Sequence, residues 1–304
     1  MRWKGLRRSR NVDDRCDGVG FGGSSGGGFP GPVSRGGMGR GTVGGGLGII
    51  VILVLGLLFG FDPNVLLQGP QQESYQPPPV SQRGAPSQAP DELADFVSAV
   101  LGSAEDTWHA IFRDELGQPY REPRLVLFSG RVHSACGMAA SAMGPFYCPT
   151  DQQVYIDLSF YRALRERFRA PGDFAQAYVV AHEVGHHVQN LLGIAERVHA
   201  MRGRVSPVEF NQIMVRTELQ ADCFAGLWAH RADRARGIIE TGDVEEALNA
   251  ASAIGDDNIQ RQTQGHVVPD AFTHGSAAQR VRWFRRGLET GRLDACDTFG
   301  AEQL

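Results

Sequence analysis

His182-Glu183-Val184-Gly185-His186 is the stretch of this 304-residue chain from which the rest can be interpreted. Two histidines four residues apart on a helix lie one turn apart on the same face, so their ring nitrogens can converge on one ion. The glutamate after the first histidine projects beside that ion. In this HExxH pattern the histidines bind zinc and the glutamate acts as a general base. The stretch therefore predicts a zinc-binding helix with a proton acceptor next to the metal.

A catalytic zinc site needs a third protein ligand and one open position. The pattern HExxHxxGxxH is excluded, because Gln189 and Leu192 occupy its Gly and last His positions. Glu218 and Asp222 lie four residues apart on the next long predicted helix and share one face. We predict that Glu218 is the third ligand and that Asp222 accepts the free N–H of a ligand histidine. Two acids at this spacing usually mark a solvated face, but the apolar residues around this pair argue against that here.

Two residues near the C-terminus are further candidates. His274 precedes a predicted helix, where it could donate a hydrogen bond to a developing oxyanion, and Arg280 within that helix could assist it or support the structure. A loop histidine at a helix start explains His274 equally well on sequence alone. His187 is rotated by about 100° from His186 on a helix, so it cannot join the same site.

Apolar periodicity predicts an α-rich α+β domain with a small sheet, an architecture like that of zincin metallopeptidases. We expect strand 154–158 to lie at a sheet edge, where an extended substrate could pair with it. The other expected strand is 125–129. The expected helices are 91–115, 159–168, 174–192, 207–234, 244–262 and 276–288.

The composition is uneven along the chain. Residues 1–61 hold 19 of the 39 glycines and eight basic residues against three acidic ones, whereas the remainder has 22 basic and 31 acidic residues. The acidic remainder argues against nucleic acid as a partner. Residues 1–43 are basic and glycine-rich, so we expect a disordered cytoplasmic segment there.

Residues 44–61 carry no charge and are strongly apolar. Eighteen residues at helical rise span about 27 Å, close to the hydrocarbon thickness of a bilayer. We therefore predict a single transmembrane helix that places the N-terminus in the cytoplasm and the later residues outside. A cleaved signal peptide fits less well, because roughly 40 residues precede the apolar run and no A-x-A site closes it. A Pro- and Gln-rich linker at 62–90 then leads to a zinc domain at 91–304.

Five cysteines complete the candidate residues. Cys16 falls on the expected cytoplasmic side and should be free, whereas the other four would meet an oxidising compartment. Cys136 with Cys148 is the favoured disulfide, and Cys223 with Cys296 would follow from it. Connectivity cannot be deduced from sequence, and Cys223 could instead be a small buried apolar residue.

Nearly the full length of the chain resembles a bacterial family of membrane-anchored neutral zinc metallopeptidases with gluzincin-like motifs, HExxH followed by ExxxD. The resemblance supports His182, His186 and Glu218 as ligands, and it implies no particular substrate. The segments that carry it are Met1–Gly5, Ser9, Asn11–Arg15, the apolar run 49–59, Gly144–Pro149, His182–Gln189, Glu218–Gly226, Phe272–Arg280 and Trp283-Phe284.

These observations lead to an expected function. The protein would be a membrane-anchored endopeptidase outside the cytoplasmic membrane, with one Zn²⁺ per chain, a peptide or protein substrate, and Glu183 as general base. One alternative is a non-catalytic envelope protein that keeps zinc for structure or for partner binding. Another is a zinc-dependent hydrolase of a non-peptide amide.

Overall fold

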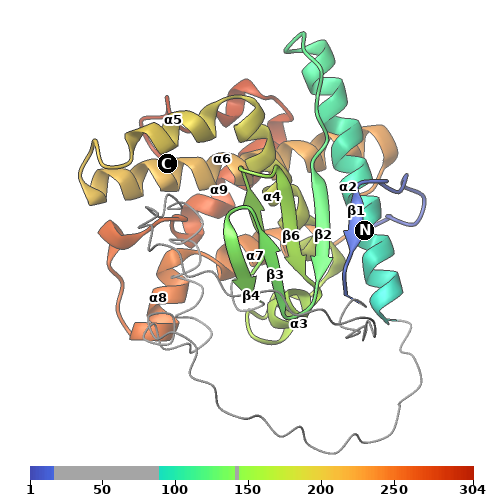
Figure 1. The fold of residues 1–304 in the computed structure, drawn as a ribbon, viewed down its shortest axis with the longest axis horizontal. Helices are drawn as coiled ribbons and strands as arrows, with labels where there is room; N and C mark the ends of the chain where they lie inside the picture. Colours follow the sequence, from blue (N-terminus) through green and yellow to red (C-terminus); the bar gives the residue numbers. More distant parts are fainter. Residues whose placement is uncertain (17–88, 141–143) are drawn as a thin grey trace, which may run out of the picture.

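Two long helices, α4 (Asp173–Leu191) and α6 (Pro207–Arg236), lie at the centre of the molecule in a computed structural model. The structure describes residues 1–16, 89–140 and 144–304. Helix α6 packs against α4 on one side and against α9 (Ala277–Thr290) on another (Figure 1). The remaining helices of the described residues are α2 (Ala89–Asp114), α3 (Leu158–Glu166), α5 (Ile194–Met201), α7 (Asp243–Ala253) and α8 (Asp256–Gln264), with short 3-10 turns at Pro269–Ala271 and Asp294–Cys296.

The main sheet has the strand order β1-β2-β6-β5. Strands β1 (Val12–Asp14), β2 (Arg124–Phe128) and β6 (Gln153–Asp157) are parallel, and β5 (Phe146–Cys148) pairs antiparallel with β6. A separate hairpin joins β3 (Arg131–Ser134) and β4 (Gly137–Ala140). The chain is thus helix-rich with small sheets, as the sequence predicted.

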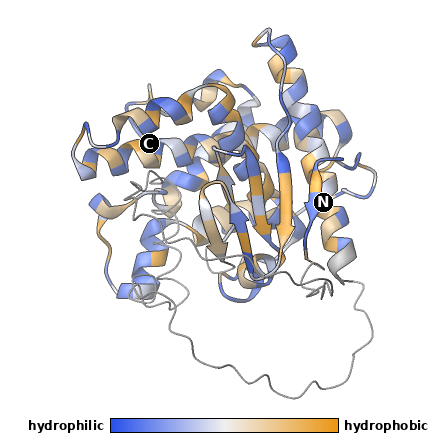
Figure 2. Ribbon diagram, viewed as in Figure 1, coloured by the Kyte–Doolittle hydropathy of each residue, from blue (hydrophilic) through white to orange (hydrophobic). Residues whose placement is uncertain are grey.

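Strand β6 is not the edge strand that its alternating sequence suggested. It is bonded on one side to β2 and on the other to β5, so its backbone is paired on both sides. Both of its faces are covered, since four of its five residues are buried. Figure 2 shows β2 and β6 as the apolar centre of the sheet. The prediction failed because β5, a three-residue strand, is too short to give a period-2 signal.

The predicted helix at 244–262 is interrupted. Helix α7 ends at Ala253 and α8 begins at Asp256. Gly255 lies between them, against the backbone of Ala277 at the start of α9, where a side chain would overlap that backbone. The turn at Gly255 therefore lets the start of α9 pack closely against it, and it divides the predicted helix into α7 and α8.

Local sequence sets the ends of the helices that carry the site. Ser206 accepts the Glu209 N–H and Glu209 reaches back to Ser206, which forms a capping box at the start of α6. Ser276 and Gln279 form the same arrangement at α9. Both helices end at a glycine in the left-handed region, Gly237 and Gly291, where residues with a Cβ are disfavoured.

Residues 1–16, which we call the N-terminal strap, are ordered against the domain and are not the disordered segment that we expected. The strap runs beside α2 and ends in β1, the outer strand next to β2 (Figure 1). Among the helices of the described residues, none is both long and apolar enough to cross a membrane. The predicted span at 44–61 lies outside the described residues.

Candidate metal centre

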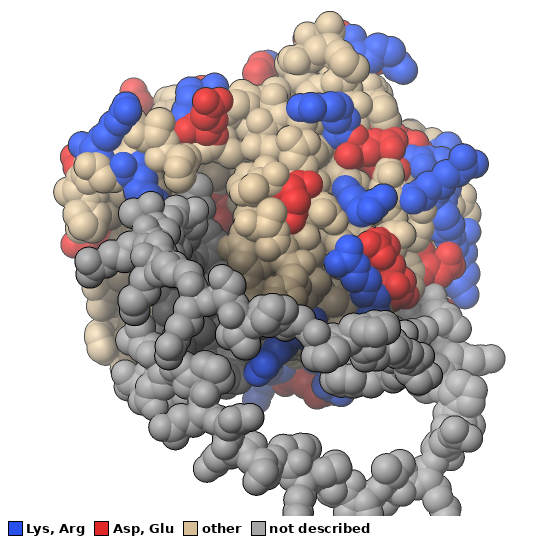
Figure 3. All heavy atoms as spheres, viewed as in Figure 1, with Lys and Arg blue, Asp and Glu red and all other residues tan. Residues whose placement is uncertain are grey.

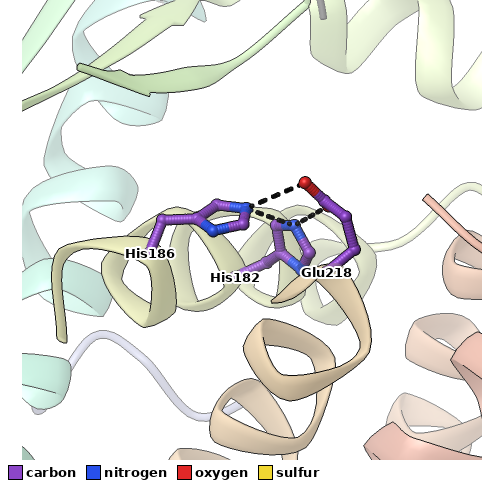
Figure 4. Close-up of side chains that lie close together, drawn as sticks. All are labelled: His182, His186 and Glu218. Carbon is purple, nitrogen blue, oxygen red and sulfur yellow. Dashed lines mark hydrogen bonds and ion pairs between the residues drawn. The ribbon is translucent and has the colours of Figure 1, made fainter. Parts of the chain in front are cut away.

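Three side chains converge where α4 meets α6. Nε2 of His182 lies 3.2 Å from Nε2 of His186 and 3.2 Å from a carboxylate oxygen of Glu218. Nε2 of His186 lies 3.6 Å from the other Glu218 oxygen. Figure 4 shows the two rings on α4 turned toward the Glu218 carboxylate on α6. The structure thus brings together the three residues that the sequence analysis selected as ligands.

A glycine inside the motif allows this convergence. Gly185 lies against Ala221, and a Cβ on Gly185 would be 3.1 Å from the Ala221 Cα. A larger side chain at residue 185 would push α4 and α6 apart and draw Glu218 away from the histidines. Ala221 sits between Glu218 and Asp222, so this close approach of the two helices lies beside the cluster.

The donor chemistry fits a zinc ion. Nδ1 of His182 lies 2.9 Å from Asp222 Oδ1, and Nδ1 of His186 lies 2.9 Å from Gln189 Oε1. Both partner atoms are acceptors, so each ring carries its proton on Nδ1 and turns an Nε2 lone pair toward the cluster. Tetrahedral zinc ligands at bond lengths of about 2.0–2.1 Å lie about 3.3 Å apart, close to the spacings found here. Two lone pairs and a carboxylate at these distances could hold a metal cation between them.

Asp222 is the centre of a buried network behind His182. Its carboxylate accepts hydrogen bonds from His182, from the Tyr178 hydroxyl and from two nitrogens of Arg280. Burial alone would raise the pKa of Asp222, but Arg280 and His182 outweigh it and hold that pKa below its usual range. An ionised Asp222 fixes the tautomer of His182 and strengthens its Nε2 as a donor.

The network shows what Arg280 contacts, and it adds two residues that the sequence analysis missed, Tyr178 and Gln189. Arg280 contacts Asp222 and Tyr178 and also lines the pocket around the cluster, so it holds the carboxylate behind His182. Tyr178 lies one turn before His182 on the same helix face, and that spacing was a usable signal. Gln189 also donates to the Thr217 carbonyl and so ties His186 to α6.

Glu183 lies beside His182 and lines the pocket that surrounds the cluster. Its side chain is largely buried, at 7% exposure. Burial raises the pKa of its carboxyl, and the neighbouring histidines only partly offset this effect. A carboxyl group in this position is placed to exchange a proton with a molecule bound in the pocket.

His274 reaches the same pocket from the loop before α9. Its Nδ1 lies 3.2 Å from Asp256 Oδ1, and the other oxygen of Asp256 accepts three backbone N–H groups, from Thr273, His274 and Gly275. Burial lowers the pKa of His274, but Asp256 and Glu218 outweigh it and raise that pKa. Asp256 therefore fixes both the loop and the ring, a role that its sequence position did not reveal.

His187, next to a ligand, belongs to a different environment. Its Nδ1 lies 3.0 Å from the Tyr147 hydroxyl and its Nε2 lies 2.6 Å from the Arg121 carbonyl. Burial lowers the pKa of His187 to about 4. It is a neutral residue that joins α4 to β5, and it stays out of the cluster as its rotation on the helix predicted.

The pocket around the cluster has a volume of about 220 Å³ and is mainly apolar. Its lining comes from the hairpin, β5, α3, α4, α5, α6 and α8, and from the loop before α9. The apolar side chains that line it include Met138, Phe146, Phe160, Val179, Met214 and Ile259.

Both predicted disulfides are present. Cys136 pairs with Cys148 at the end of β5, and Cys223 on α6 pairs with Cys296 near the C-terminus, with Cα separations of 5.8 and 5.5 Å. Cys16 is free and half-buried.

Comparison with known proteins gives a family. Residues 1–299 match the model of the family described as "Putative neutral zinc metallopeptidase". The chain belongs to this family. It is 48% identical over 303 residues to the uncharacterized protein YpfJ of Escherichia coli, covering 99% of each chain. It is 42% identical over 262 residues to the uncharacterized protein Rv2575 of Mycobacterium tuberculosis, covering 82% of this chain and 86% of that one. No solved structure gave a significant match.

Proposed function

We propose that this member of the family is a zinc-dependent endopeptidase with one catalytic Zn²⁺ per chain. The observation that carries the proposal is the pair of histidines His182 and His186, whose Nδ1 atoms are both occupied by acceptors while their Nε2 atoms meet Glu218. Three protein ligands with a buried glutamate beside them are typical of a catalytic zinc site, whereas structural sites have four protein ligands.

The proposed chemistry divides the work among a few side chains. A zinc ion bound by His182, His186 and Glu218 would supply a Lewis acid for the scissile carbonyl and for the attacking water. Glu183 removes a proton from that water and then delivers it to the leaving amine. His274, held by Asp256, donates a hydrogen bond to the oxyanion as it forms.

The surroundings of the site favour a peptide with apolar side chains. The buried charged residues of the pocket are engaged with one another, as in the pairs Arg280–Asp222 and His274–Asp256. The uncommitted lining, such as Met138 and Phe146, is apolar. Strand β5 replaces β6 as the candidate to pair with an extended substrate, because it is the outer strand next to α4.

Two disulfides also support the predicted location of this domain outside the cytoplasmic membrane. Such bonds persist in oxidising compartments and are rare in the cytosol. Contact of residues 44–61 with the membrane is part of the proposal on sequence grounds alone.

The decisive test is metal analysis and peptide-library cleavage with the full chain. We expect wild type and Glu183→Gln to bind one zinc each, and Glu183→Gln to lose activity by about 10²–10⁴-fold. Glu196→Gln, a change at an exposed position on α5, is the matched control and should behave as wild type. Zinc bound by all three proteins with equal cleavage by Glu183→Gln would contradict the proposal and favour a non-catalytic zinc protein. Glu183-dependent hydrolysis of non-peptide amides alone would replace the peptide substrate and keep the zinc chemistry.

A further inference from the structure

The N-terminal strap is bound along its whole length to residues that follow it by 80 or more positions. The Arg2 N–H donates to the Ile238 carbonyl at 2.8 Å, and the Ser9 N–H to the Ser98 carbonyl at 3.0 Å. Strand β1 then continues the main sheet through three residue pairs with β2. The strap is therefore an element of the domain rather than a tail that touches it.

A buried acid on α2 depends on the strap. Glu105 is fully buried, and its carboxylate accepts from Arg7 at 2.8 Å, Ser9 at 2.6 Å and Asn11 at 2.8 Å. All three donors belong to the strap. A carboxylate buried without such partners would be strongly disfavoured, so Glu105 is suited to its position only while the strap is in place.

A glycine on the same helix gives independent evidence. Gly102 lies in the interior of α2, where glycine destabilises a helix by about 1 kcal/mol relative to alanine. A Cβ at residue 102 would overlap the Arg7 carbonyl oxygen and lie 3.1 Å from the Ser9 backbone nitrogen. The strap occupies the space that a side chain would need, which explains a residue that the helix alone disfavours.

Apolar and charged contacts complete the interface. Met1 and Leu6 are buried in the main core, and the Trp3 ring packs edge-on against Phe96. The Arg8 guanidinium pairs with Asp95. Figure 3 shows basic and acidic side chains interspersed on the side of the molecule where β1 and α2 lie in Figure 1. Helix α2 thus matches the strap in shape, in polarity and in charge.

We infer that residues 1–16 and residues 89–304 lie on the same side of any membrane that the chain meets. Hydrogen bonds of 2.8–3.0 Å between the strap and the domain cannot form across a hydrocarbon layer of about 30 Å. A single span at 44–61 would put the strap and the domain on opposite sides. The proposed arrangement therefore replaces the cytoplasmic N-terminus that the sequence predicted, while contact of residues 44–61 with a membrane stays compatible with it. This last step rests on the proposed function: with the domain outside the cytoplasm, as the two disulfides support, the strap is outside as well.

Cysteine labelling of the full chain in intact cells tests this arrangement. In a Cys16→Ser background, Arg10→Cys places one free thiol on the strap, and Arg204→Cys places a matched one on the domain, both at exposed positions. A membrane-impermeant maleimide is applied before and after lysis, and thermal unfolding of each purified variant checks that it folds. We expect both thiols to be labelled in the same fraction before lysis.

The possible outcomes separate this inference from the proposed function. Labelling of Arg204→Cys before lysis and of Arg10→Cys only after it, or the reverse, would overturn the same-side arrangement. Labelling of both only after lysis would support the same-side arrangement and contradict the location of the enzyme outside the cytoplasm. Loss of peptidase activity in Glu183→Gln bears on neither result.

Discussion

Asp222 and Glu105 are two fully buried carboxylates in one domain, and each is satisfied by residues far away in the sequence. Asp222 on α6 is bonded to His182 and to Arg280. Glu105 on α2 is bonded to the strap, through Arg7 and its neighbours. The same physical requirement, a partner for every buried charge, supports the metal centre in one place and fastens a distant segment in the other.

The two sites differ in the exposure of the arginine that pairs with the carboxylate. The Arg280 side chain is only 3% exposed, whereas that of Arg7 is 42% exposed. Loss of Asp222 would strand a buried charge, but loss of Glu105 leaves Arg7 in contact with water. Asp222 is also bonded to Nδ1 of His182, a proposed zinc ligand. We therefore expect that, of the two acids, only Asp222 affects the chemistry.

The largest expected effect is that of Asp222→Ala. Breaking a buried ion pair on one side costs about 3–5 kcal/mol of unfolding free energy. Removing the acceptor behind a ligand histidine weakens metal binding by about 10–100-fold. Urea unfolding and competitive zinc titration measure the two effects, with Asp222→Asn as the milder companion. Wild-type zinc affinity in Asp222→Ala would contradict the role given to this network.

Glu105→Ala should destabilise the protein and leave catalysis unchanged. We expect a loss of about 1–3 kcal/mol, because Ser9 and Asn11 lose their buried acceptor. The matched control is Asp106→Ala, which removes an exposed partner of Arg7 and should cost less than about 1 kcal/mol. Unfolding in urea and kcat/KM are the measurements. If Glu105→Ala changed kcat/KM and left stability intact, the comparison would fail.

Gly102→Ala tests whether a side chain at residue 102 raises or lowers the unfolding free energy. Helix propensity predicts a gain of about 1 kcal/mol in unfolding free energy. Overlap with the Arg7 carbonyl predicts instead a net loss of about 1–3 kcal/mol. Faster amide exchange in residues 1–16 should accompany the loss. A more stable Gly102→Ala protein would show that the strap does not occupy this space.

The smallest expected effect concerns pH. Burial raises the pKa of Glu183, and this base must be ionised to accept a proton, so the acid limb of kcat/KM should lie above the ordinary glutamate pKa of about 4.3. Glu105→Ala should leave that limb in place, since residue 105 is remote from the cluster. An acid limb at or below the ordinary glutamate pKa would show that burial does not raise the pKa of Glu183.

The sequence revealed local features that repeat at fixed spacing. The pairs His182 with His186 and Glu218 with Asp222 could be read because an α-helix places residues four apart on one face. The long helices were found for the same reason. Tyr178 has that spacing too and was overlooked, whereas the role of Asp256 could not be read, because its partners lie on a loop 17–19 residues later.

The sequence by itself therefore determined which side chains are candidate metal ligands and which helices carry them, and it favoured the two cysteine pairs that the structure then joined. Tertiary structure alone decided which strand lies at the edge, where a predicted helix breaks at Gly255, and that residues 1–16 belong to the domain. The reason is that each of these depends on contacts between segments distant in the chain. A basic N-terminal stretch gives no sign of Glu105 until folding places α2 beside it.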